Sequence, residues 1–411
     1  MLILFYFFAA LLIIQGLVSL LEGLRFRSFV RSSLRKSPGP FAPPASIIAP
    51  CKGMEAGLER NLEALFAQDY PDYEIIFVIA SPDDPARPVI ERLIERHKGQ
   101  PARLVIAGPA SGRGEKVNNL LSALDHVRPG SEAFAFSDSD ARARAGWLRA
   151  LVAPLEGDGV GAATGYRWYL PERAERAGFR AALLSAWNGS IATSLGDHGR
   201  NFTWGGSTAI LRKTFEGINV RARWENAVSD DYALTKAVRD AGLDIRFVPR
   251  CLVVARENPG LASLLEFTTR QIIITRVYNP RLWRVGLISH LWFCSTFFGG
   301  LALVAGGALA GGPFTLAAVM LGTIYALGSL KGILRLVAAR EALAPVRDEI
   351  MRLWWMLCLL WPLVSILFSY NFVRSATTRR ITWRGVTYEM RSPDSTVIIS
   401  PARLARASEL M

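Results

Sequence analysis

The first 21 residues of the chain carry no charge. The stretch MLILFYFFAALLIIQGLVSLL reaches Leu21 before the first charged residue, Glu22. About 20 consecutive apolar residues match the length of a helix that crosses a bilayer. A cleavable signal peptide would begin with basic residues and end at a small-residue cleavage site, and neither is visible here. We therefore expect residues 1–22 to form an uncleaved transmembrane anchor.

Basic residues follow the anchor, with no acid among them: Arg25, Arg27, Arg31, Arg35 and Lys36. Because Lys and Arg concentrate in loops on the cytoplasmic side, the large middle region should be cytoplasmic, at the inner membrane in a bacterium. Contact with anionic lipid is a further use for these charges. The net charge of +13 therefore needs no nucleic acid partner, and no DNA-reading motif is visible. Residues 23–44 are expected to form a basic linker that ends in the Pro-rich KSPGPFAPP.

Short apolar runs alternate with helical patterns beyond the linker. ASIIAP, YEIIFVIA, ARLVIA and AFAFS are typical of strands, and LERNLEALFAQ and EKVNNLLSALDHV are typical of amphipathic helices. Near-continuous apolar strands separated by helices indicate a mostly parallel sheet that is covered on both faces. We expect an α/β domain over residues 45–260. In such sheets, ligands bind beyond the carboxyl ends of the strands.

Three further apolar stretches begin at Val285, Phe314 and Leu353. If all three cross the membrane, the tail with Arg374, Arg379, Arg380 and Arg384 lies outside, against the usual distribution of basic residues. One stretch is then re-entrant or interfacial; the middle one is the shortest, but the sequence leaves the choice open. We expect an interfacial helix over residues 261–284, a C-terminal transmembrane region over 285–373 and a basic tail over 374–411.

Two aspartates, Asp138 and Asp140, follow the AFAFS strand with one serine between them. Side chains alternate along a strand, so both carboxylates share one side if the chain stays extended. Two carboxylates with open coordination positions suit a hard divalent cation that also binds phosphates. We therefore expect Mg²⁺ or Mn²⁺ at this pair, brought with a diphosphate. A solvated turn, or a cap for the helix near Ala145, is the alternative.

Other polar positions occur at strand ends and helix starts. Asp83 and Asp84 follow a strand, where a helix cap explains one of them. Lys116 and Asn118 lie at a helix start that favours phosphate, with polar residues of an exposed helix surface as the alternative. Gly205 and Gly206 permit close approach of a ligand to the backbone, or a turn. Asp230 and Asp231 open an amphipathic helix, where capping explains one acid and a general base would use the other.

These motifs occur in a familiar order: PCKG at residues 50–53, DDPA at 83–86, KVNNL at 116–120, Asp138, GRNFTWGGSTAILRK and SDDYALTKAVRDAG. The chain resembles the ceramide glucosyltransferases over residues 45–276. These are membrane-bound inverting glycosyltransferases with the GT-A fold, akin to the cellulose and hyaluronan synthases. The resemblance implies an α/β GT-A nucleotide-diphospho-sugar transferase with transmembrane helices at both ends.

The resemblance also implies roles for the residues. Asp83 or Asp84 would contact the donor nucleotide, with Asn118 nearby, and Lys116 would contact its base or diphosphate. Asp138 and Asp140 would hold the metal. Asp231 would deprotonate the acceptor hydroxyl. His198 matches a histidine beside the acceptor, although a structural role is the alternative, and the acceptor side would include Gly205, Gly206, Asp230 and Arg270.

One motif departs from the family. Its members carry Gln or Arg, two residues, then Arg-Trp on a helix at the membrane face. Here FTTRQIIITRVY has Arg270 in the first place but Ile273 and Ile274 where Arg-Trp would stand. Arg276 offers a charge one turn later, and nothing replaces the indole.

The leading hypothesis is a metal-dependent inverting glycosyltransferase of glycolipid biosynthesis. It would move a sugar, by resemblance glucose from UDP-glucose, to a ceramide-like or other membrane lipid. A polysaccharide synthase is an alternative, opposed by the small number of apolar stretches and the missing Trp. A catalytically inactive, membrane-anchored binding or scaffold protein is an alternative of another class, which the retained acids oppose.

Overall fold

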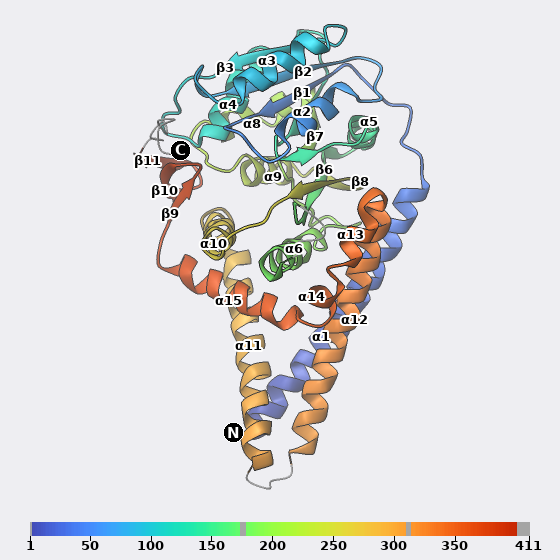
Figure 1. Ribbon diagram of the computed structural model, residues 1–411, viewed down its shortest axis with the longest axis vertical. Helices are drawn as coiled ribbons and strands as arrows, with labels where there is room; N and C mark the ends of the chain where they lie inside the picture. The colour runs from blue at the N-terminus through green and yellow to red at the C-terminus, as the bar shows by residue number, and fades with distance from the viewer. Residues whose placement is uncertain (1, 173–177, 310–313, 401–411) are drawn as a thin grey trace.

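The computed structural model describes residues 2–172, 178–309 and 314–400 (Figure 1). The body of the molecule is an eight-stranded sheet in the order β3-β2-β1-β4-β7-β6-β8-β5. Pairing is parallel from β3 through β4 and between β6 and β8, whereas β7 runs antiparallel to both neighbours. The predicted mostly parallel α/β class is confirmed. The strands are β1 (Ala45–Pro50), β2 (Tyr73–Ile79), β3 (Ala102–Ile106), β4 (Ala133–Ser137), β5 (Ala141–Arg142), β6 (Val160–Leu170), β7 (Ser207–Leu211) and β8 (Asp244–Arg256).

Helices cover both faces of this sheet because its strands are apolar on both sides. In β1, Ile47 packs into one core with α2, α3 and α5, whereas its neighbour Ile48 packs into a second core with α4, α8 and α9. This is the two-residue alternation of a strand buried on both faces. The helices are α2 (Leu58–Phe66), α3 (Arg87–Arg96), α4 (Glu115–Leu124), α5 (Trp147–Val152), η1 (Ala153–Glu156), α6 (Phe179–Ala192), α7 (Arg212–Gly217), α8 (Val220–Trp224) and α9 (Asp230–Asp240).

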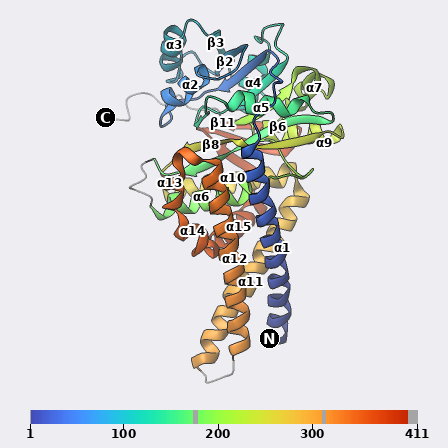
Figure 2. The ribbon, with the colours of Figure 1, turned by 90° about the vertical axis from the view of Figure 1, so that its right-hand side faces the viewer.

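Three helices extend away from the sheet domain on one side (Figures 1 and 2). In the described part of the chain, α1 (Leu2–Arg35), α11 (Pro280–Leu309) and α12 (Thr315–Ala342) are long and apolar enough to cross a membrane. Helix α1 continues through the basic residues to Arg35. The expected linker therefore begins in the helix, and only its Pro-rich part, from Lys36, is extended.

The third apolar stretch of the C-terminal half does not form one long helix. It is divided between α14 (Trp354–Cys358) and α15 (Trp361–Ala376), and Pro362 lies in the first turn of α15. Proline begins a helix readily but cannot continue one, which explains the break. Helix α15 packs beside α10 (Leu261–Tyr278) and crosses α11 in Figure 1. Short segments η3 (Ala344–Val346) and α13 (Arg347–Met351) connect α12 to α14.

The expected basic tail over 374–411 is a folded element in its described part. Strands β9 (Arg380–Trp383), β10 (Val386–Ser392) and β11 (Ser395–Ser400) form an antiparallel sheet. Its buried residues Ile381, Val386, Tyr388 and Met390 pack against Ile273 and Ile274 of α10. Residues 401–411 of the predicted tail lie outside the described residues.

Candidate active site

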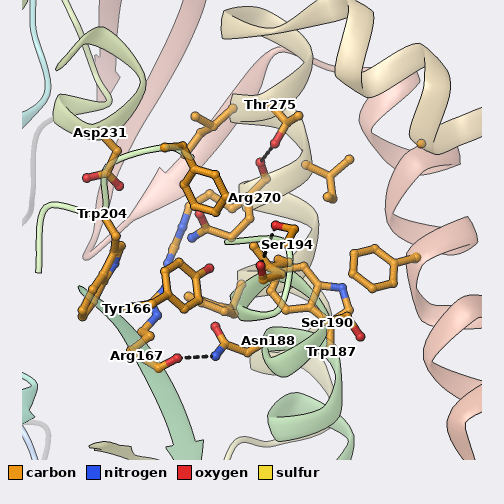
Figure 3. A pocket seen from close by; sticks show the side chains of 18 of the residues that line it. Tyr166, Arg167, Trp187, Asn188, Ser190, Ser194, Trp204, Asp231, Arg270 and Thr275 are labelled. Atoms are coloured by element: carbon orange, nitrogen blue, oxygen red, sulfur yellow. Dashed lines mark hydrogen bonds between the residues drawn. The ribbon is translucent and has the colours of Figure 1, made fainter. Parts of the chain in front are cut away.

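The sheet, the long helices and the C-terminal sheet surround one cavity of about 1050 Å³. Figure 3 shows Asp231 and Trp204 on one side of this space, Trp187 and Ser190 of α6 on the other, and Arg270 of α10 between them. Its polar end lies beyond the carboxyl ends of β1 and β4, as expected for a parallel sheet.

Asp138 and Asp140 both line the polar end of the cavity. The chain does not stay extended after β4, because Asp138 and Ala141 close a turn through an N–H···O bond of 3.4 Å. Ser139 lines the same cavity and donates to Glu55 Oε2 at 2.7 Å. Neither aspartate caps α5, whose N-cap is Gly146. The two carboxylates thus line one cavity through a turn, and not through the extended chain that was the condition for their sharing one side.

Lys116 lies between two of the predicted acids. Its Nζ is 2.8 Å from Asp138 Oδ1 and 3.2 Å from Asp230 Oδ2. Burial alone would lower the pKa of Lys116, but the neighbouring carboxylates raise it above the ordinary value. Lys116 is thus a charged side chain that holds two acids together, and its ammonium faces the cavity.

Asp230 and Asp231 both line the cavity, and neither caps α9. The cap is Ser229, whose Oγ accepts a bond from Tyr232 N at 3.2 Å. Burial, and next the charge of Asp230, raises the pKa of Asp231 well above its usual range. A carboxylate in this environment is a better proton acceptor than an exposed one.

The glycine pair lies directly behind these acids. Gly205 N–H donates to Asp231 Oδ1. A Cβ at Gly205 would overlap Asp230 and Asp231, and a Cβ at Gly206 would overlap the Trp204 ring and Asp138. The two glycines therefore allow the start of β7 to pack against the acids, whereas the close approach of a ligand to this backbone stays a prediction.

Arg167 of β6 is a cavity residue that the sequence analysis missed. Its Nη1 is 3.9 Å from Asp140 Oδ2, and its guanidinium stacks 4.9 Å from the centre of Tyr169 and 5.4 Å from that of Trp204. Nothing in the local sequence marks Arg167 as functional, because its role depends on the register of β6 beside the β4 turn. Glu257, at the end of β8, and Glu55 line the same cavity and were also missed.

Six predicted residues do not line the cavity: Asp83, Asp84, Asn118, His198, Gly205 and Gly206. Asp84 Oδ1 accepts bonds from Gly53 N at 2.8 Å and Ala86 N at 2.9 Å, which ties the β1 and β2 ends together. Asp83 is exposed. Asn118 donates to Gly108 O at 3.2 Å, and His198 Nδ1 accepts from Arg200 N at 3.2 Å. Asp84 and Asn118 shape the loops around the site.

Arg270 lines the cavity, as the predicted acceptor side requires, and donates to Thr382 O at 3.1 Å. Its guanidinium lies 5.6 Å from the centre of Trp383 in β9. Arg276 does not supply a charge to the cavity, because it donates to Ser375 O at 2.7 Å. An indole therefore does lie beside Arg270, but it comes from the C-terminal sheet.

A divalent cation fits this polar end. In residues 2–172, 178–309 and 314–400 no group of three or more His, Cys, Asp and Glu side chains is arranged as a complete metal site. Asp140 Oδ1, however, is buried and has no hydrogen-bond partner, and Asp138 faces the same space. Two carboxylates with oxygens to spare suit a cation that completes its shell with substrate phosphates.

Comparison with known proteins places this chain in a family. Residues 4–396 match the family described as Glycosyl transferase family 21. The chain belongs to glycosyl transferase family 21. The family match and the mostly parallel sheet agree with the predicted GT-A fold class.

Relatives of this family-21 chain include named enzymes. It is 26% identical over 272 residues to ceramide glucosyltransferase 1 of Caenorhabditis elegans, covering 65% of this chain and 55% of the relative. It is 29% identical over 125 residues to the ceramide glucosyltransferase of Candida albicans, covering 28% of this chain and 23% of the relative. The chain thus matches about half, or less, of the length of these relatives.

Among solved structures, a mannosyltransferase of Pyrobaculum calidifontis in complex with GDP-Man and Mn²⁺ aligns with 90% of this chain and 98% of its own length. The sequence identity is 18% and the TM-score 0.49.

Proposed function

We propose that this protein is a metal-dependent inverting glycosyltransferase that transfers glucose from UDP-glucose to a ceramide-like membrane lipid. One observation carries the proposal: a single cavity joins the acid cluster to the membrane helices. At one end it is lined by Asp138, Asp140 and Asp231, and at the other by Leu12 of α1, Phe293 of α11 and Leu327 of α12. A lipid acceptor can thus remain in the bilayer while its hydroxyl reaches the acids.

The membrane end of the cavity suits an amphipathic acceptor. Arg335 of α12 lines it and donates to Thr193 Oγ1 at 3.1 Å and Ser190 Oγ at 3.0 Å. Lys331 lines it and donates to Ser19 Oγ of α1. Ser19 precedes the end of the apolar stretch, so this polar group lies at the level of lipid head groups if α1 spans the bilayer. The relatives named ceramide glucosyltransferases support a lipid acceptor.

The proposed chemistry divides between two sides of the polar end. Asp138 and Asp140 would hold Mg²⁺ or Mn²⁺ with the donor diphosphate, and the cation would stabilise the departing nucleotide. Asp231 would take the proton of the acceptor hydroxyl as its oxygen attacks the anomeric carbon from the side opposite the leaving group. Inversion at that carbon follows from a single displacement. Asp83, Asp84 and Asn118 would shape the nucleotide side, with the catalytic domain on the cytoplasmic side of the membrane.

A transfer assay with Asp231→Asn tests this proposal. The purified protein is incubated with UDP-glucose, Mn²⁺ and ceramide, and the lipid product is identified by mass spectrometry. Asn keeps the shape of Asp231 but accepts no proton, so turnover should fall about a hundred- to ten-thousand-fold. Binding of UDP with Mn²⁺ should change little, because Asp138 and Asp140 are untouched. EDTA should abolish both binding and transfer.

The alternatives predict different results in the same assay. A catalytically inactive binding or scaffold protein would neither hydrolyse UDP-glucose nor form product, and a polysaccharide synthase would form product without added lipid. If Asp231→Asn lost donor affinity in step with turnover, Asp231 would belong to the metal site and the base would have to be sought at Asp230.

A further inference from the structure

The turn of the C-terminal hairpin has an unusual backbone. Arg384 and Gly385 connect β9 to β10 and both have positive φ, 49° and 80°. Two-residue turns of this kind favour Asn-Gly or Gly-Gly, because left-handed backbone costs energy for residues with a Cβ. A long cation at the first position is therefore unfavourable for the turn itself. Such a residue persists where its side chain is needed for another purpose.

The Arg384 side chain reaches the polar end of the cavity. It forms an ion pair with Glu55 and donates through Nη1 to Lys52 O, in the loop that follows β1. Its side chain is 39% exposed, against 25% for Lys52 and 13% for Lys116, which are held by Glu115 and by two aspartates. Among these ion-paired cations Arg384 is the most accessible to a ligand.

The C-terminal sheet, which includes the hairpin, is held in this position by hydrogen bonds to α4, to α10 and to the loop between α8 and α9. Tyr388 is buried and its hydroxyl accepts from Glu115 N at 3.1 Å, at the start of α4. Arg270 of α10 donates to Thr382 O at 3.1 Å. Thr396 Oγ1 donates to Asn226 O at 2.9 Å. These bonds place the turn over the site, although Arg384 follows the site's first strand by more than 300 positions.

The inner face of the hairpin also carries Trp383. This side chain lines the cavity, and the guanidinium of Arg270 lies 5.6 Å from its ring centre. Ile273 and Ile274, which replace Arg-Trp on α10, are 4% and 7% exposed and pack under the same hairpin. Apolar residues at these two α10 positions therefore provide the surface on which the hairpin docks.

We propose that the β9–β10 hairpin completes the substrate site: Arg384 binds the diphosphate of the donor, and Trp383 forms an aromatic wall on the acceptor side. The inference rests on the proposed function. On donor binding, the guanidinium exchanges the Glu55 carboxylate for phosphate oxygens, which a planar fork of N–H groups can bind in pairs. The C-terminal sheet thereby supplies a cation and an indole in place of the Arg-Trp pair that α10 lacks at residues 273 and 274.

Substitution of Arg384 by Asn separates a ligand role from a structural one. Asn-Gly is a preferred pair for this turn, so Arg384→Asn should leave the unfolding temperature unchanged or higher. The same change should weaken binding of UDP with Mn²⁺, measured by titration calorimetry, about tenfold or more. Arg380→Gln is the matched control, because Arg380 pairs with Glu389 on the exposed face of the hairpin and should change binding less than twofold.

The outcomes distinguish the two proposals. Unchanged UDP affinity in a stable Arg384→Asn protein would overturn the hairpin proposal and leave the proposed function intact. If the wild-type protein bound no nucleoside diphosphate with Mn²⁺, in a panel of UDP, GDP and ADP, both proposals would fail.

Trp383 is tested on the acceptor side. Trp383→Ala should raise the KM for the lipid acceptor several-fold while UDP affinity stays within twofold, and Trp383→Phe should restore most of the loss. An unchanged acceptor KM in Trp383→Ala, or no rescue by Phe, would overturn the aromatic-wall assignment.

Discussion

At the scale of residues, the two aspartates after β4 are in different environments. Asp138 Oδ1 is 2.8 Å from the Lys116 ammonium. Asp140 Oδ2 is 3.9 Å from the Arg167 guanidinium, and Asp140 Oδ1 is buried without a hydrogen bond. Burial, and next the Asp138 charge, raises the pKa of Asp140 to about 6. At neutral pH, without a cation, Asp140 is therefore ionised at a cost to stability.

Asp140→Asn should stabilise the metal-free protein at pH 7.5. The ionisation cost is fully present above the folded-state pKa of about 6 and disappears as the pH falls below the ordinary value of 3.8. We expect a gain on the order of 1–3 kcal/mol at pH 7.5 that vanishes near pH 4. Thermal unfolding in detergent with EDTA at both pH values measures it. Asp138→Asn is the control and should show no gain in stability, because it removes the ion pair with Lys116. An equal gain of Asp140→Asn at both pH values would contradict the explanation.

Gly206→Ala should damage the site directly. The added Cβ would overlap the Trp204 ring and the Asp138 carboxylate, so one of them must move. Transfer activity should fall at least about tenfold, since a small displacement of a positioning group is costly to catalysis. Gly217→Ala is a matched control, because nothing lies within 4 Å of its Cβ position. Equal activity of both variants would show that the site tolerates the shift.

At the scale of elements, α10 and the C-terminal sheet depend on each other. Ile273 and Ile274 of α10 share one apolar cluster with Ile381, Val386 and Met390 of the hairpin. The hairpin alone would be marginal in water, since a few short strands need an apolar partner surface to be stable. Helix α10 provides that surface, and the hairpin in turn covers the cavity.

Ile273→Arg, which brings back one residue of the family motif, should therefore not improve activity. Ile273 is 4% exposed, so the guanidinium would be buried without a partner and the hairpin would be displaced. We expect a loss of at least about 2 kcal/mol of stability. Thermal unfolding and the transfer assay measure it, with Ala262→Arg on the exposed side of α10 as the control. A stable and more active variant would show that the hairpin does not depend on this contact.

At the scale of the whole molecule, three helices in the described part of the chain are long and apolar enough to cross a membrane. Helix α1 begins far from the sheet, α11 leads away from it and α12 returns (Figure 2). Helix α15 crosses α11 instead of running along the three helices, and the C-terminal sheet contacts the sheet domain on the same side. Its arginines then agree with the preference of basic residues for the cytoplasmic side.

Cysteine labelling in intact cells tests this topology. In a Cys294→Ser background, a Cys at Leu316, exposed at the start of α12, should react with a membrane-impermeant maleimide. A Cys at Arg391 in β10, or at Lys36 after α1, should react only after the membrane is opened. Labelling at Arg391 but not at Lys36 in intact cells would contradict the contacts of the C-terminal sheet with the domain, and labelling at both positions would overturn the proposed orientation.

Much of the local structure was decided by the sequence alone. The runs ASIIAP and AFAFS became β1 and β4 with the predicted bounds, because strands buried on both faces are marked by continuous apolar residues. The acids after them lie at one sheet edge because parallel strands end together. The membrane-length helices at residues 2–35, 280–309 and 315–342 were likewise visible as apolar stretches.

The tertiary structure decided what completes the site. Arg270 and Thr382 are 112 positions apart, and nothing near either residue shows that the C-terminal strands fold back over α10. Those strands are short and partly basic, so the sequence predicted only a basic tail. They fold as a sheet because they pack on the apolar surface of α10. Arg167 lies beside Asp140 because of how β6 pairs with its neighbouring strands. The third apolar stretch crosses α11 and does not form one long helix, because the chain breaks before Pro362. Such features depend on contacts between distant segments, which local composition and spacing do not record.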